Sequence, residues 1–354
     1  MKAFILLIAA LLITVSSAYA QESMPSADVH PYVASTPLPP SARLTGLRPV
    51  YQQFNRCSAA ALTIHLSYFG WQGTYSDTIR ALNPNAEDVA VRLDEMVDFA
   101  AQQGLSGLYR NGGTLDLLRA LVAGGFPVLM ENVYYDGPNA FNDWMSHNRV
   151  VMGYDDAKQE IYVFDSLLGN GPDDTGRPIP YADIDSRWRP FNRDFMVLYR
   201  PEDEAKVESI VGDYWDATYA NEVALQLSQQ ELDGGNSDSF TLFNMGSSLV
   251  DLGRYAEAAD AFDRARGIGL PFRMMWYQYG PFEAYYHEQR YDDMLTLARD
   301  VIATTPGVEE SYYYAGLAYE AEGDLQRAKS NFEVAAWRNP DFTLAKQALT
   351  RVGG

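Results

Sequence analysis

The sequence predicts an α+β domain followed by an all-α domain of helical repeats. Three observations support this fold class. Residues 58–123 show the apolar spacing of helices, residues 127–199 contain four short apolar runs typical of strands, and the chain from residue 239 onward repeats at the period of a helix pair. Because 354 residues exceed the usual size of one domain, two domains are expected.

The N-terminus has the pattern of an export signal. Lys2 is followed by an apolar run over 4–15 and by small residues that would precede a cut after Ala20. A run of this length is too short to span a bilayer, but it is typical of a signal peptide. We expect residues 1–20 to be removed, leaving a periplasmic or secreted protein without an integral membrane segment. An uncleaved N-terminal anchor is the alternative.

Composition divides the remainder of the chain. Residues 21–46 are rich in Ser, Pro and Ala, which predicts a flexible or extended lead-in. The α+β domain is expected over 47–201. A helical linker is expected over 202–238, where a glycine-rich stretch marks a boundary, and the repeat domain over 239–354.

The charge balance excludes some classes of partner. The formal net charge is −20 at pH 7, so nucleic acid and anionic lipid are poor matches. The sequence has no metal-binding motif and no phosphate-binding glycine loop. No metal and no cofactor are therefore expected.

The first half of the α+β domain is expected to be helical. Apolar residues cover most of the surface of a helix over 58–69, so this helix should be buried, and Gly70 should end it. Further helices are predicted over 74–103 and 114–123.

The second half of this domain has the period of strands. Strands are predicted over 127–133, 148–154, 160–165 and 195–199. Turn residues at 155–158 predict a hairpin between the second and third of them. A helical half followed by an antiparallel half places a cleft between the two halves.

Two stretches of the repeat domain match each other at an offset of 70 residues. Gly246 and Phe262 correspond to Gly316 and Phe332, and a weaker copy surrounds Phe282. Small residues where paired helices touch, at a period near 34 residues, match the tetratricopeptide pattern. About three repeats are expected, with a concave face that binds a peptide or protein partner. An unrelated helical bundle is the alternative.

Cys57 is the only cysteine of the chain and lies where an irregular segment becomes a helix. Unpaired N–H groups and the macrodipole at a helix N-terminus favour a thiolate. A lone cysteine in an exported protein is either buried and inert or retained for its reactivity. Its neighbours have to decide between these two interpretations.

A cysteine nucleophile needs a base, and the chain has four histidines. His30 lies in the lead-in and His287 in the repeat domain. His65 would lie about 12 Å along the helix from Cys57, and a core role explains it better. His147 remains, at the start of a predicted strand across the expected cleft.

The base in turn needs an orienting carboxylate. The predicted hairpin brings Asp165, at the end of its second strand, beside His147. Asp155 and Asp156 are the alternatives, but they lie at the turn end of the hairpin.

An oxyanion intermediate also needs N–H donors. Gln52 precedes Cys57 by five residues, so its amide can donate alongside the Cys57 backbone N–H. Gln53 is the alternative, and spacing alone does not separate the two.

These segments resemble those of a known family. Residues 51–60, YQQFNRCSAA, are similar to the nucleophile segment of the C39-like branch of papain-fold cysteine peptidases. Residues 144–156, WMSHNRVVMGYDD, and residues 164–166, FDS, are similar to its histidine and aspartate blocks. The resemblance covers about residues 47–201 and implies a papain-like fold.

The resemblance also implies hydrolysis of peptide bonds through a thioester. The implied nucleophile, base, orienting group and oxyanion donor are Cys57, His147, Asp165 and Gln52. The family usually has glycine directly after the cysteine, whereas this chain has Ser58, followed by alanine. We expect a secreted cysteine peptidase whose repeats dock a peptide or protein. The alternatives are a catalytically silent papain-like scaffold protein and an acyl-transfer enzyme, a transpeptidase or amidase, with the same triad.

Overall fold

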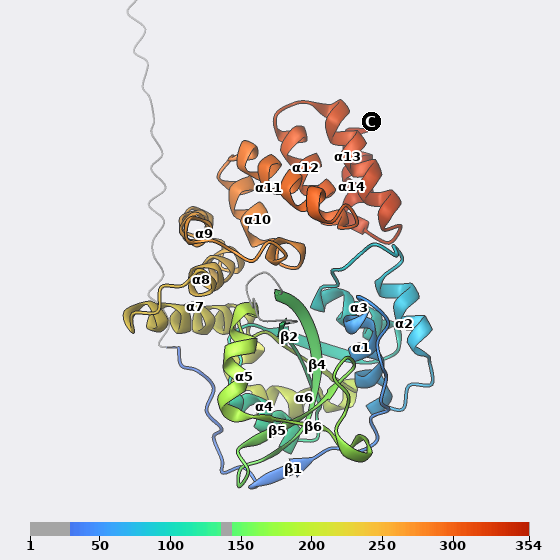
Figure 1. Ribbon diagram of the computed structural model, residues 1–354, viewed down its shortest axis with the longest axis vertical. Helices are drawn as coiled ribbons and strands as arrows, with labels where there is room; N and C mark the ends of the chain where they lie inside the picture. The colour runs from blue at the N-terminus through green and yellow to red at the C-terminus, as the bar shows by residue number, and fades with distance from the viewer. Residues whose placement is uncertain (1–28, 136–143, 354) are drawn as a thin grey trace, which may run out of the picture.

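The computed structural model describes residues 29–135 and 144–353, so the predicted signal peptide and the first part of the lead-in lie outside the described residues. It contains a sheet domain flanked by helices and, beside it, a stack of helices that carries the C-terminus (Figure 1). The predicted fold class, an α+β domain followed by an all-α domain, is confirmed.

An antiparallel sheet forms the centre of the first domain. Its seven strands are β1 (Ser41–Arg43), β2 (Ser106–Arg110), β3 (Val128–Tyr135), β4 (Trp144–Asp155), β5 (Glu160–Asp165), β6 (Arg177–Pro180) and β7 (Phe195–Tyr199). They follow the order β2-β7-β3-β4-β5-β6, and β1 pairs with β4. Strands β3, β4, β5 and β7 were predicted. The sequence analysis missed β1, β2 and β6. Strands β1 and β6 have only three and four residues, and β6 contains two prolines that strand patterns exclude, whereas β2 is as long as β7.

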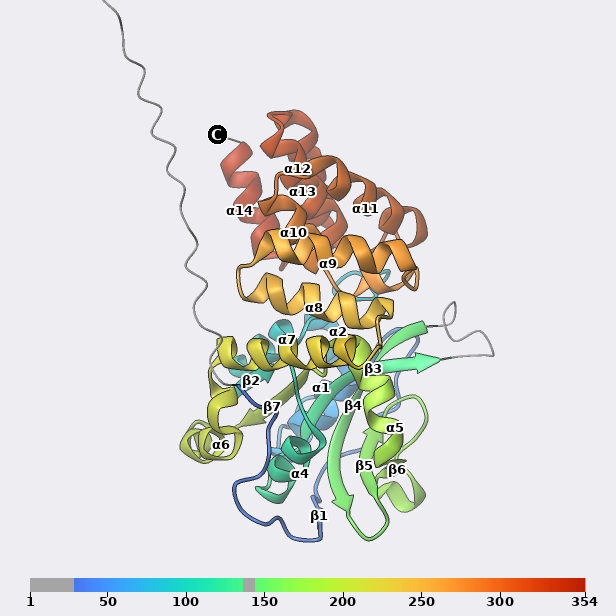
Figure 2. The ribbon, with the colours of Figure 1, turned by 90° about the vertical axis from the view of Figure 1, so that its left-hand side faces the viewer.

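Helices cover both faces of the sheet (Figures 1 and 2). They are α1 (Cys57–Tyr68), α2 (Tyr75–Leu82), α3 (Leu93–Gln102), α4 (Leu115–Ala123), α5 (Tyr181–Trp188), α6 (Glu204–Val211) and α7 (Ala217–Asp233). Alternate residues of β7 belong to different cores. Met196 and Leu198 pack with α1 and α3, whereas Phe195 and Val197 pack with α4, α6 and α7.

Two segments are more closely attached to the sheet than the sequence analysis expected. In the described part of the lead-in, Val29 is buried in the core and residues 41–43 form strand β1. The segment 202–238 is helical, but it is not a free linker, because α6 and α7 bury Val207 and Val223 against the sheet. Both segments contribute apolar side chains to the core of the sheet domain, and their amino-acid composition alone did not indicate this.

The second domain is a stack of helix pairs (Figure 2). Its helices are α8 (Ser239–Asp251), α9 (Tyr255–Ile268), α10 (Gly280–His287), α11 (Tyr291–Thr304), α12 (Glu309–Ala321), α13 (Leu325–Arg338) and α14 (Thr343–Val352). A Cβ atom on Gly246 would lie 2.6 Å from the ring of Phe262, and one on Gly316 would lie 2.5 Å from the ring of Phe332. The small residues of the repeat pattern therefore lie where paired helices touch.

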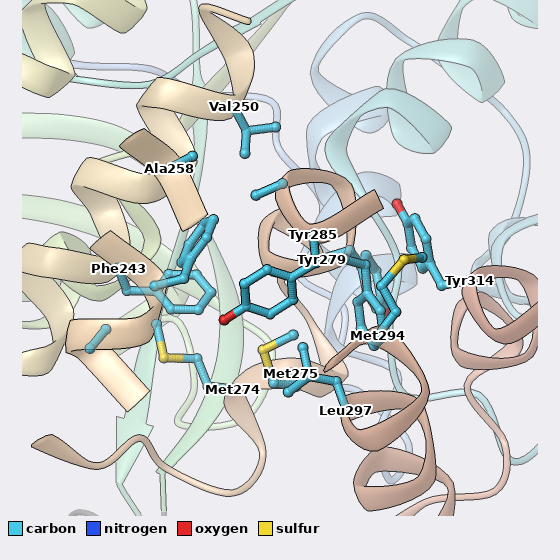
Figure 3. Close-up of a cluster of buried hydrophobic side chains, with 14 of the residues drawn as sticks. Phe243, Val250, Ala258, Met274, Met275, Tyr279, Tyr285, Met294, Leu297 and Tyr314 are labelled. Atoms are coloured by element: carbon cyan, nitrogen blue, oxygen red, sulfur yellow. The ribbon is translucent and has the colours of Figure 1, made fainter. Parts of the chain in front are cut away.

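One apolar core runs through the repeats and reaches the sheet domain. Figure 3 shows part of it, from Phe243 on α8 to Tyr314 on α12. The same core includes Trp144 of β4, whose ring stacks on Phe191 with the centroids 5.2 Å apart. Because the two domains share this core, the repeats are held in a fixed position against the sheet domain.

Candidate active site

Cys57 is the first residue of α1, whose buried length packs against β4. The residue before it anchors the start of the helix. The Arg56 guanidinium donates to the carbonyl oxygens of Ala86 at 2.7 Å and Asp88 at 3.0 Å. The Cys57 side chain remains partly exposed and lines a cavity of about 260 Å³. The cysteine is therefore neither disulfide-bonded nor sealed in the core.

Strand β4 brings His147 to this cavity, and β5 brings Asp165 to His147. His147 Nε2 lies 2.9 Å from Asp165 Oδ1. The strands pair with Arg149 directly opposite Asp165, so His147 is a diagonal neighbour of the carboxylate on the same face of the sheet. The structure thus brings these two predicted residues together in the hairpin that the sequence indicated.

The Asp165 carboxylate is fully buried and held by four donors. Besides His147, these are the backbone N–H groups of Leu167 and Leu168, at 2.9 and 2.8 Å, and the Nε of Arg149, at 2.7 Å. Burial raises the pKa of Asp165, but the hydrogen bond and charge of His147, the charge of Arg149 and the Leu168 N–H outweigh it. The net pKa lies far below the usual value, so Asp165 is a carboxylate at neutral pH.

The thiol and the imidazole shift each other's pKa in opposite directions. Burial raises the pKa of Cys57, but the hydrogen bond and charge of His147, helped by Asn148, outweigh it, and the net pKa is lowered. Burial lowers the pKa of His147, but its hydrogen bonds with Asp165 and Cys57 outweigh it, and the net pKa is raised. Because Nε2 is taken by Asp165, Nδ1 is the ring nitrogen available to the thiol. The arrangement favours a thiolate–imidazolium pair.

The residue that departs from the family pattern has a partner of its own. Ser58 is buried, and its Oγ accepts a hydrogen bond of 3.0 Å from the side-chain amide of Asn148. The same amide nitrogen lies 3.9 Å from Cys57 Sγ. Ser58 therefore holds a donor beside the nucleophile.

Gln52 lies in the same cavity in a defined orientation. Its backbone N–H donates to the carbonyl oxygen of Ser166 at 3.0 Å, and its Oε1 accepts from Ser166 Oγ at 2.8 Å. This leaves Nε2 as the group that can donate into the cavity. Gln53 also lines the cavity, but it is exposed, and its backbone N–H is bonded to Tyr75 Oη.

The sequence analysis missed three residues of the site. Asn148 and Arg149 directly follow His147, and their place in the same strand was the only available signal. Tyr277 comes from the repeat domain and lines the cavity of Cys57. Burial, followed by the charges of Cys57 and of a glutamate on β3, raises the pKa of Tyr277. No local pattern in the sequence pointed to it.

The other histidines and the alternative carboxylates lie elsewhere. His65 is buried in the core, and burial lowers its pKa to about 3. His287 stacks on a tyrosine ring of α9 with the centroids 3.7 Å apart. The backbone N–H of His30 donates to a tyrosine of α7. At the turn of the hairpin, Asp156 pairs with Arg119.

Among residues 29–135 and 144–353, no group of three or more His, Cys, Asp or Glu side chains is placed to hold a metal ion. None of the helices in these ranges combines the length and the apolar character needed to cross a membrane.

Comparison with known proteins gives two family matches. Residues 47–194 match the profile of the Peptidase_C39 like family, and residues 310–341 match that of the tetratricopeptide repeat. No curated protein matches the chain.

Several solved structures are similar to parts of the chain. Xylellain, a cysteine protease from Xylella fastidiosa, is 16% identical over 49% of this chain and 91% of that one, with a TM-score of 0.37. A C39-like peptidase from Bacillus anthracis is 14% identical over 45% of this chain and 98% of that one, with a TM-score of 0.34. A double glycine motif protease from an AMS/PCAT transporter, in complex with the leader peptide, is 14% identical over 45% and 94%, with a TM-score of 0.32.

The two family matches coincide with the two parts of the structure. The first extends from the segment before α1 almost to β7, and the second falls on α12 and α13. The α+β domain therefore coincides with the match to the Peptidase_C39 like family, and the helical stack with the match to the tetratricopeptide repeat.

Proposed function

We propose that the protein is a cysteine peptidase that hydrolyses peptide bonds with a Cys57–His147–Asp165 triad. One observation carries this proposal. The partly exposed thiol at the start of α1 lines the same cavity as a buried imidazole, and that imidazole is bonded to a buried carboxylate, with His147 Nε2 2.9 Å from Asp165 Oδ1. An inert cysteine in a protein core does not need an imidazole and a carboxylate beside it.

Each residue of the site has a distinct role in the proposed reaction. The Cys57 thiolate attacks the substrate carbonyl carbon, and the oxyanion accepts hydrogen bonds from Gln52 Nε2 and the Cys57 backbone N–H. His147 gives its proton to the leaving amine, and a thioester remains. His147 then takes a proton from water, which attacks the thioester and releases the acid. Asp165 keeps the imidazole in the orientation that both transfers require.

Export of the protein is part of the same proposal. The pattern of residues 1–20 supports it, since a basic start, a short apolar run and small residues before Ala20 are typical of a cleaved signal. Cell fractionation and sequencing of the mature N-terminus test it. A mature chain that still begins at Met1 would contradict cleavage.

The triad is tested by the pH dependence of Cys57 alkylation. In the wild type, iodoacetamide should label Cys57 rapidly below pH 7, because His147 lowers the thiol pKa. His147→Ala should move the midpoint toward about 8.5, the value of an unperturbed cysteine. His287→Ala, which removes a histidine of the repeat domain, is the matched control and should leave the profile unchanged.

Peptide cleavage completes the test. Wild-type protein should hydrolyse members of a peptide library, and Cys57→Ala should not. If the Cys57 thiol of the wild type has a pKa near 8.5 and the protein cleaves no peptide, the protein is a catalytically silent scaffold. Amide products that form only in the presence of an added amine would identify acyl transfer instead.

A further inference from the structure

Two cavities meet where the peptidase domain faces the repeats. The cavity of Cys57 and a larger one of about 610 Å³ are both lined by Val91 and Tyr277. The larger cavity is also lined by Val250 of α8, Glu283 of α10 and Tyr314 of α12. The two cavities together are called the interdomain trough below. Its lining extends from Cys57 to helices α8, α10 and α12 of the repeats.

Tyr277 makes the repeat domain part of the wall beside the nucleophile. It follows the short 3-10 turn Met274–Trp276, and its ring lies 5.9 Å from that of Trp144 on β4. Its hydroxyl also interacts with the backbone of Ser146, the residue before His147. A peptide bound at Cys57 would therefore touch both domains.

The end of the trough near Cys57 holds an unsatisfied hydrogen-bond acceptor. Asn83 lines this cavity, its side chain is only 6% exposed, and its Oδ1 has no partner among the described residues. Buried polar groups are nearly always paired. A backbone N–H of an extended peptide would supply the missing donor, as in the pairing of a peptide with a strand edge.

The end of the trough at the repeats carries unpaired negative charge. Asp251, at the end of α8, and Glu283 of α10 line the larger cavity, and neither forms an ion pair with any arginine or lysine in the described part of the chain. Their charges act on each other, because Glu283 adds to the effect of burial in raising the pKa of Asp251 to about 6. Their hydrogen-bond partners, Asn111 and Tyr314, are uncharged.

The arginines of the larger cavity do not neutralise this charge. Arg92 is bonded to Asp94 and Glu310. Within the described part of the chain, Arg110 donates only to backbone carbonyl oxygens, among them that of Tyr214 at 3.0 Å. Aromatic rings, which attract cations to their faces, make up much of the remaining lining. They belong to Tyr109, Phe191, Tyr277, Tyr279, Tyr313, Tyr314 and Phe342.

We propose that the substrate is an extended peptide that runs from Cys57 through the interdomain trough and places a lysine or arginine side chain beside Asp251 and Glu283. Asn83 positions the backbone of this peptide next to the nucleophile, and Tyr277 forms the wall over which it passes. This inference rests on the proposed peptidase function, since it names the substrate class of the same site.

The test compares peptides that differ in one side chain. A set of fluorogenic peptides with lysine at each position in turn is compared with the same set carrying glutamine. At one position, the lysine peptide should have a higher kcat/KM than the glutamine peptide. Asp251→Asn combined with Glu283→Gln should reduce this preference for lysine about tenfold and leave kcat/KM for the glutamine peptides unchanged. The matched control, Asp260→Asn with Glu288→Gln, removes two exposed carboxylates outside the trough and should retain the advantage.

Asn83→Ala tests the positioning role. It should raise KM for lysine and glutamine peptides alike by about fivefold, which is the effect of one neutral hydrogen bond, and leave the alkylation rate of Cys57 unchanged. A slower alkylation rate would mean that the substitution disturbs the triad, and would overturn the assignment of Asn83 to the substrate.

The outcomes separate this inference from the proposed function. Equal cleavage of lysine and glutamine peptides by the wild type would overturn the inference and leave the peptidase standing. If no peptide is cleaved, the binding of the labelled lysine peptides to the Cys57→Ala variant tests the inference independently of cleavage. Binding that the Asp251 and Glu283 substitutions weaken and the control substitutions do not would support the trough, and absence of binding would overturn it.

Discussion

The side-chain amide of Asn148 lies 3.0 Å from Ser58 Oγ and 3.9 Å from Cys57 Sγ, so one residue of β4 contacts both Cys57 and the residue after it. Both Asn148 and Ser58 are buried. The serine that replaces the usual glycine of the family therefore belongs to a hydrogen bond that joins α1 to the sheet.

Removal of this serine should destabilise the fold. Ser58→Ala leaves the Asn148 amide without its partner, and we expect a loss of about 1–3 kcal/mol in the free energy of unfolding. Asn148→Ala should cost a similar amount, and the double variant less than the sum of both. Urea denaturation of the four proteins measures the coupling. Strict additivity would show that the contact contributes nothing, and the exposed Ser186→Ala should have no effect.

Asp165→Asn should impair the triad while leaving the hairpin in place. The amide cannot stabilise an imidazolium as the carboxylate does, so kcat/KM should fall by roughly 10³–10⁴-fold, as in other triads. The pKa of His147 should fall with it, and the alkylation midpoint of Cys57 should rise. Asp155→Asn, at the turn end of the same hairpin, is the matched control. Equal losses in the two variants would assign the effect to the hairpin rather than to the carboxylate.

Replacement of each glutamine by alanine distinguishes the role of Gln52 from that of Gln53. Ser166 fixes the Oε1 of Gln52, which leaves Nε2 to donate to an oxyanion. Gln52→Ala should therefore lower kcat by about 10²–10³-fold with little change in KM. Gln53→Ala, at an exposed position in the same cavity, should change kcat far less. A larger loss at Gln53 would reverse the assignment.

The sequence was sufficient to bring His147 and Asp165 together because the relationship between them is local. Turn residues at 155–158 define the hairpin, and a hairpin determines which residues of its two strands are neighbours. Cys57 could be placed at a helix start for a similar reason, since the apolar pattern begins directly after it.

Long-range contacts could not be predicted in this way. Tyr277 reaches the cavity of Cys57 only because the two domains share a core around Trp144. The packing of α6 and α7 on the sheet, and the pairing of β1 with β4, likewise depend on partners far away in the chain. A periodic pattern shows which side of an element is apolar, but not what covers it.

Gly316→Ala should destabilise the C-terminal repeat. The added methyl group would lie 2.5 Å from the ring of Phe332, so α12 and α13 would have to move apart. We expect a loss of roughly 1–3 kcal/mol, seen as an earlier unfolding step of the repeats. Gly323→Ala is not a suitable control, because its positive φ adds strain of another kind. Gly267→Ala, which meets nothing within 4 Å, should not destabilise the domain.

The protein should lose stability as the pH rises from about 5 to 8. Burial is the main cause that raises the pKa of Glu131 to about 8 and of Glu95 and Glu310 to about 7. In the unfolded chain these groups titrate near 4.3, so the folded state binds more protons between these values. The stability they contribute is present below about pH 4 and is lost as the pH passes through 7 to 8.

Glu310 offers the sharpest test of this pH dependence, because it lies where α12 meets the sheet domain, 3.2 Å from Arg92. Glu310→Gln keeps a side-chain oxygen for Arg92 and removes the carboxylate. The free energy of unfolding should then fall less between pH 5 and 8, by about 1–3 kcal/mol relative to the wild type. Exposed Glu288→Gln should leave the slope unchanged. If the free energy of unfolding of the wild type rises over this pH range instead, these carboxyl groups ionise in the folded protein without a cost in stability. The junction between the domains then does not hold protons at neutral pH.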